Sequence, residues 1–219
     1  MIVSALLISL KISITSILLS SMAGIALARI LYKRNNVLRS IIENILLIPI
    51  FLPPSIVGYI LLVVIGRNGV LGSVIYGIFE SGIIFTWWAG VLATFIMSLP
   101  IVYQNSKAAF FSINHDCEEA AKVDGAGRLQ IFMKVTIPMA SKGLLAGIIL
   151  GFARAFGEFG ATIMVAGNIP GRTQTLPIAM YYAVEGGNKI LANQILAVVL
   201  IISFSLIALF NYFSRNTEE

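Results

Sequence analysis

Charged side chains are scarce in this sequence. Only 11% of its 219 residues are Asp, Glu, Lys or Arg, whereas 58% are hydrophobic and the mean hydropathy is +0.93. A soluble domain of this length carries roughly 25% charged residues. Water cannot cover so apolar a surface, so lipid must cover much of it. The composition excludes a soluble domain and predicts a single all-α integral membrane domain over residues 1–219.

Cysteine, histidine and nucleotide-binding motifs are almost absent. The single cysteine, Cys117, excludes an intramolecular disulfide and a cysteine-cage metal site. The chain contains no G-x-x-x-x-G-K-[ST] phosphate loop. We therefore expect no metal and no cofactor in this chain. The net charge of +5 reflects basic residues that flank apolar runs, which is typical of membrane topology rather than of nucleic-acid binding.

Long apolar runs make up most of the chain. A membrane-spanning helix needs about 20 mostly apolar residues. The runs that qualify are residues 4–31, 41–65, 83–111, 143–167 and 191–213. The sequence thus predicts about five spans, with a glycine-rich surface loop that contains one or two helical turns over residues 66–82. Pro49, Pro53, Pro54 and Pro100 should bend the second and third spans.

The basic residues also predict the orientation. No basic region precedes the first apolar run and four basic residues follow it, which is the reverse of a signal peptide. We expect an uncleaved span with the amino terminus outside and the carboxyl terminus in the cytoplasm of a prokaryotic cell. The cytoplasmic side then holds most of the basic residues, as the positive-inside rule requires: Arg29, Lys33, Arg34, Arg39, Lys107, Lys122, Arg128, Lys134, Lys142 and Arg215, against Arg67, Arg172 and Lys189 outside.

The polar segment between the third and fourth spans reads as two short helices. The first should begin at a cap on Asn114 or Asp116 and stop at Gly125, and the second should cover about residues 127–136 and end at Pro138. The second helix carries one apolar ridge, formed by Leu129, Phe132 and Met133. Such a helix can lie on the membrane, pack under its own bundle or enter a groove on a partner, and the residues alone do not choose.

A spaced pattern in this loop resembles a known family. Glu119-Ala120-Ala121, then Gly125, then Val135-x-Ile137-Pro138 is similar to the Glu-Ala-Ala loop of binding-protein-dependent ABC importer permeases. Val135 and Ile137 stand where the family pattern has Ile and Leu. The resemblance implies that residues 114–138 dock on a separate ATPase, with Leu129, Phe132 and Met133 filling an apolar cleft. ATP and Mg²⁺ would then bind in that ATPase and not in this chain.

The fourth span carries two further patterns. Gly143, Gly147, Gly151 and Ala155 recur every four residues and predict a close approach of another helix. Arg154, Glu158 and Thr162 recur at the same spacing on a neighbouring face. An arginine inside a span needs a partner or water. Arg154 and Glu158 can hold the bundle together as a pair, or they can line a polar translocation path, and both interpretations stay open.

The segment from Phe152 to Pro177 points to one branch of the family. Ala-Arg-Ala-Phe-Gly-Glu-Phe-Gly at residues 153–160 and Asn-Ile-Pro-Gly-Arg-Thr-Gln-Thr-Leu-Pro at residues 168–177 resemble the molybdate permeases, and sulfate permeases share the first part. In the outer loop, hydrogen-bond donors suit a docked binding protein, an outer gate or an oxyanion: Asn168, Arg172, Thr173, Gln174 and Thr175. We expect docking or a gate, because an exposed loop competes with water for every donor.

The resemblance implies a homodimer that faces two cytoplasmic ATPase subunits and receives an oxyanion from an extracytoplasmic binding protein. The expected cargo is molybdate or the similar tungstate. An ABC permease for sulfate, thiosulfate or another oxyanion is the first alternative. An ion-coupled secondary transporter is a distant one, disfavoured by the coupling-loop pattern and by the absence of a second inverted repeat of spans.

Overall fold

The computed structural model describes residues 1–32, 37–79 and 82–215. Two of the basic residues that support the expected orientation, Lys33 and Arg34, lie outside these ranges. The described chain is helical throughout, and its elements follow one another as α1 (Ile2–Tyr32), α2 (Val37–Phe51), α3 (Pro54–Ile65), α4 (Val70–Phe79), α5 (Trp87–Phe111), α6 (His115–Val123), α7 (Arg128–Ile131), the π-helix η1 (Phe132–Thr136), α8 (Ile137–Phe156), α9 (Gly160–Ala166), α10 (Leu176–Glu185) and α11 (Lys189–Arg215). Four helical stretches within the described residues are long and apolar enough to cross a membrane.

Three long helices, α1, α5 and α8, form the centre of the bundle because small residues let them approach closely. A Cβ atom added at Gly143 would lie 2.7 Å from Ala109 Cβ of α5, and one added at Gly147 would lie 2.6 Å from Asn105 Cβ. The glycine ladder is therefore a packing surface, as its spacing predicts.

A buried stripe of serines on α1 joins it to α5 and to the outer loop. Ser16 bonds to Thr94, the Ser20 and Ser98 hydroxyls lie 2.7 Å apart, and Ser9 Oγ accepts the backbone N–H of Leu176 at 2.7 Å. These short side chains pair their hydrogen-bonding groups with one another and with the backbone, and they are small enough to let the helices pack closely. They fix the position of α1 along α5.

The second expected span is not one helix. The chain turns by 116° between α2 and α3. Pro53 cannot donate a backbone hydrogen bond, and Pro54 occupies the first turn of α3, where proline is tolerated. The 12 residues of α3 reach roughly 18 Å, too short for a core of about 30 Å. The prolines therefore break this segment rather than bend it.

The fourth expected span also has different bounds. Its helix is continuous from Arg128 through η1 to Phe156, and the chain breaks at Gly157–Phe159 before α9. The helical part expected in the glycine-rich loop after α3 is α4, which has 10 residues.

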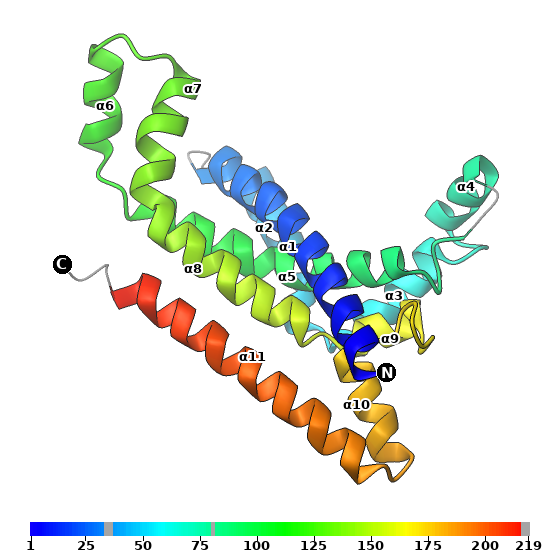
Figure 1. Ribbon diagram of the computed structural model, residues 1–219. Coiled ribbons are helices and arrows are strands. Elements are labelled where there is room, and N and C mark those ends of the chain that lie inside the picture. Colours follow the sequence, from blue (N-terminus) through cyan, green and yellow to red (C-terminus); the bar gives the residue numbers. More distant parts are fainter. Residues whose placement is uncertain (33–36, 80–81, 216–219) are drawn as a thin grey trace.

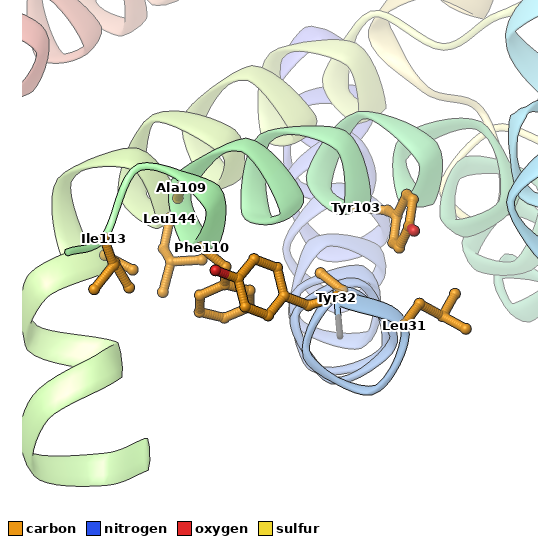
Figure 2. Packing of buried hydrophobic residues seen from close by; sticks show 9 residues of the cluster. Leu31, Tyr32, Tyr103, Ala109, Phe110, Ile113 and Leu144 are labelled. Carbon is orange, nitrogen blue, oxygen red and sulfur yellow. The ribbon is translucent and has the colours of Figure 1, made fainter. Parts of the chain in front are cut away.

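The long helices place the described loops at two ends of the molecule. Helices α6 and α7 project at one end, near which the C-terminal end of α11 lies, whereas the amino terminus lies among α9 and α10 (Figure 1). A cluster of buried side chains from α1, α5 and α8 supports the base of α6 and α7, including Tyr32, Tyr103, Phe110 and Leu144 (Figure 2).

Candidate functional site: a helical hairpin and a buried ion pair

The hairpin of α6 and α7 begins and turns at the residues that the sequence predicts. The Asn114 side chain accepts the backbone N–H of Asp116 at 3.0 Å and caps α6. Gly125 ends the first helix with φ of +83°, a conformation that favours glycine. Glu119 and Ala120 are exposed on this hairpin and Ala121 is half-buried. The signature residues are thus available to a partner.

The second helix of the hairpin does not end at Pro138, contrary to the sequence prediction. The π-helix η1 follows α7 directly and passes into α8, which has Pro138 in its first turn. The backbone N–H of Ile137 bonds to the Phe132 carbonyl, five residues back. This wider turn gives the proline ring room that a regular α-turn lacks, so the helix continues. The hairpin is therefore joined to α8 by continuous helix.

The predicted apolar ridge is divided between two faces. Leu129 is 74% exposed and Met133 is 56% exposed. Phe132 instead turns inward, where its ring lies 6.3 Å from the Phe110 ring and 5.3 Å from the Arg29 guanidinium. Leu129 and Met133 are therefore exposed to a partner, whereas Phe132 of η1 is half-buried against α1 and α5. The entry of all three side chains into a cleft on the ATPase stays a prediction.

Glu118, which the sequence analysis did not single out, anchors the hairpin. Its side chain is 4% exposed, and Oε1 accepts hydrogen bonds from Arg29 Nη1 at 3.1 Å and Thr136 Oγ1 at 2.6 Å. These two partners belong to α1 and η1. The carboxylate thus joins the first hairpin helix to both the second and the membrane bundle. A cavity of about 670 Å³ opens beside it, lined by Arg29, Glu118, Lys122, Arg128, Leu129, Ile131 and Phe132.

Arg154 and Glu158 form an ion pair, but not along one helix. Glu158 lies in the break after α8, and its second oxygen accepts the backbone N–H of Ala161 at 2.8 Å. Its side chain is 1% exposed, whereas that of Arg154 is 29% exposed. The carboxylate therefore ties the end of α8 to the start of α9, while part of the Arg154 side chain lies at the surface of the bundle.

Thr162 does not continue this polar row. It is completely buried in α9, and no hydrogen-bond partner for its hydroxyl lies among the residues that the structure describes. Its Cγ2 lies near Gly90 of α5, where an added Cβ would come within 3.6 Å. The helical spacing that suggested a common face with Arg154 is lost at Gly157.

The outer loop is largely buried, contrary to the expectation of an exposed one. Thr173, Gln174 and Thr175 are at most 4% exposed, and among the candidate donors only Arg172 is exposed. Gln174 Nε2 bonds to Asn168 Oδ1 at 2.8 Å, and Thr173 Oγ1 accepts the backbone N–H of Ile169 at 3.1 Å. These bonds hold the loop together, and the bond from the Leu176 N–H to Ser9 Oγ ties it to α1.

The bundle, its broken helices and the projecting hairpin define a polytopic membrane transport subunit. The chain belongs to the family of binding-protein-dependent transport system inner membrane components, whose model matches residues 16–219. It is therefore the permease subunit of an ABC importer, a multi-pass inner membrane protein and not itself an enzyme.

Individual relatives and one solved structure agree with the family. The chain is 44% identical over 191 residues to the putative molybdenum transport system permease protein YvgM of Bacillus subtilis, covering 87% of this chain and 82% of that protein. It is 36% identical over 219 residues to the molybdenum transport system permease protein ModB of Haemophilus influenzae, covering 99% and 95%. An inward-facing structure of the MetNI methionine ABC transporter has the same fold, with a TM-score of 0.73, 18% identity, and coverage of 98% of this chain and 95% of that one.

Proposed function

We propose that this chain conducts molybdate into the cytoplasm as the permease of an ATP-driven importer. The observation that carries the proposal is the projecting hairpin, together with similarity over most of the chain to permeases named for molybdenum transport. Tungstate has the same shape and charge, and we include it in the substrate class.

The hairpin is the proposed contact with a cytoplasmic ATPase dimer. Glu119, Ala120 and the exposed pair Leu129 and Met133 offer one carboxylate, a small residue and an apolar edge. ATP and Mg²⁺ bind in the ATPase. When its subunits close, the hairpin transmits the movement to α8 through the continuous helix at η1 and to α1 through the Glu118–Arg29 ion pair.

Two copies of the chain form the translocation path in this proposal. In a single copy of the chain, only 6% of the most apolar 18-residue window of α11 is buried, and no residue of α2 is buried. Both helices therefore have faces available to lipid or to a second copy. Arg154 contributes to the path, since it is the more exposed member of the Arg154–Glu158 pair. The pairing weakens its hold on an anion and allows release.

The proposed orientation has the amino terminus outside and the carboxyl terminus in the cytoplasm. The hairpin then faces the ATPase, and the 168–177 loop faces the extracytoplasmic binding protein as an outer gate. The basic residues near the hairpin agree with the positive-inside rule.

Uptake by the complex reconstituted in liposomes tests the cargo. We expect uptake of molybdate with the cognate ATPase and binding protein and ATP inside, and no uptake without ATP. Uptake of sulfate but not of molybdate would keep the permease and refute the cargo. Uptake driven by an ion gradient without the ATPase would refute the proposal as a whole.

A further inference from the structure

A cavity of about 460 Å³ lies where α1, the start of α5 and the outer loop meet. This is the end of the molecule that carries the amino terminus (Figure 1). Two cationic side chains, Lys11 of α1 and Arg172 of the loop, line it together with Trp87, Thr173 and neighbouring residues. The lining contains no acidic residue. Within the described ranges, no carboxylate lies at ion-pair distance from either cation.

Lys11 is an unusual residue for its position. It lies in the apolar helix α1, where a charge is costly unless it is paired or hydrated. Its ammonium sits 3.8 Å from the centroid of the Trp87 ring, which holds the side chain over the cavity by a cation–π contact. A cation–π contact leaves the positive charge in place, so Lys11 remains able to attract an anion.

Arg172 is presented on a rigid turn. The Ile169 carbonyl accepts the backbone N–H groups of Arg172, Thr173 and Gln174 at 2.9–3.1 Å. The Leu176 N–H then fastens the loop to Ser9, two residues before Lys11 on α1. The two cations are thus carried by elements that are bonded to each other, and little ordering entropy is lost when a ligand bridges them.

We propose that this cavity binds the tetrahedral oxyanion transiently after the binding protein releases it and before it enters the translocation path. The site rests on the proposed function for its cargo. Two positive charges without a carboxylate between them favour a small dianion, and the guanidinium and ammonium together supply several donors to its oxygens. Because the cavity is open at the surface of the chain, its hold is weak, which suits a step on a path.

The experiment uses the reconstituted complex in liposomes of neutral lipid, with molybdate as the probe. The variants are Lys11→Gln, Arg172→Gln and Arg172→Lys. The matched control is Arg67→Gln, because Arg67 also stacks on an aromatic ring, Tyr76 at 4.5 Å, but does not line the cavity. Maximal uptake rate, the half-saturating concentration of loaded binding protein and complex assembly are measured for each.

We expect each glutamine variant at Lys11 or Arg172 to lower the maximal uptake rate about tenfold. A change of this size corresponds to the loss of roughly one charge-assisted contact. Arg172→Lys should recover most of the rate, Arg67→Gln should stay within about twofold of the wild type, and the half-saturating concentration should not change. A raised half-saturating concentration with an intact maximal rate would show that Arg172 docks the binding protein instead.

Two further outcomes would overturn the site. Equal rates for all variants would remove it, and defects that occur only in liposomes of anionic lipid would assign the cavity to a lipid headgroup. If the wild type transports sulfate but not molybdate, the proposed cargo fails, and the same comparison made with sulfate still decides whether the cavity is an oxyanion site.

Discussion

Neutralising Glu118 should loosen the hairpin, whereas the same change at its neighbour Glu119 should not. Glu118 is buried and bonded to Arg29 and Thr136, while Glu119 is exposed. Removing one partner of a fully buried ion pair costs about 3–5 kcal/mol. Arg29 is 25% exposed and can bind water once it is released, so the expected cost of Glu118→Gln is smaller, about 1–3 kcal/mol.

Because the hairpin projects from the bundle, this cost should appear as local opening rather than as global unfolding. A loss of about 2 kcal/mol raises the open population roughly thirtyfold. Hydrogen exchange of residues 114–138 in the detergent-solubilised complex measures this directly. We expect the backbone amides of the hairpin to exchange faster in Glu118→Gln and at the wild-type rate in Glu119→Gln. We also expect ATP hydrolysis to be less tightly coupled to uptake in Glu118→Gln.

A double-mutant cycle provides the control. Arg29→Gln and Glu118→Gln should be less than additive in their effect on exchange, because either change alone removes the same pair. Wild-type protection in Glu118→Gln, or equal exchange in the Glu118 and Glu119 variants, would refute the reasoning that Glu118 anchors the hairpin.

Further predictions concern the ion pair and the glycine ladder. Arg154→Gln, which leaves the buried Glu158 carboxylate unpaired, should destabilise the protein by about 1–3 kcal/mol, and Arg154→Gln with Glu158→Gln should recover part of this loss in a thermal melt. If the double variant also transports at the wild-type rate per complex, neither residue lines the path. Gly151→Ala should cost about 1–3 kcal/mol, since its Cβ would lie 2.7 Å from side chains of both α1 and α5. Gly77→Ala, with no atom within 4 Å, should not destabilise the protein, and equal melting of the two alanine variants would contradict the packing argument.

The sequence predicts the hairpin well because its signals are local. An Asn114 cap and a glycine stop at Gly125 each act within a few residues, and the structure confirms both. The different environments of Glu118 and Glu119 could not be predicted, since the Glu118 partner Arg29 lies 89 residues away in the chain.

The bounds of the spans are harder to predict, because hydropathy does not detect a break in a helix. Apolar residues continue on both sides of Pro53 and of Gly157, although the helix is interrupted at both. The topology also predicts an exposed outer loop, yet Thr173 and Gln174 use their polar groups to close it. The serine stripe on α1 has helical spacing and was the available signal that α1 packs on another polar-lined helix.

The most direct test of the account is oxyanion-stimulated ATP hydrolysis by the reconstituted complex, comparing wild type, Gly125→Val and Gly127→Val. Gly125 has φ of +83°, which a β-branched residue rarely adopts, whereas Gly127 has an ordinary φ of −68°. We predict that molybdate-loaded binding protein stimulates the wild type and the Gly127 variant, and that stimulation is lost in the Gly125 variant while the complex stays assembled. Failure of the wild-type chain to associate with any ATPase, or full stimulation in Gly125→Val, would contradict the claim that this hairpin couples ATP hydrolysis to transport.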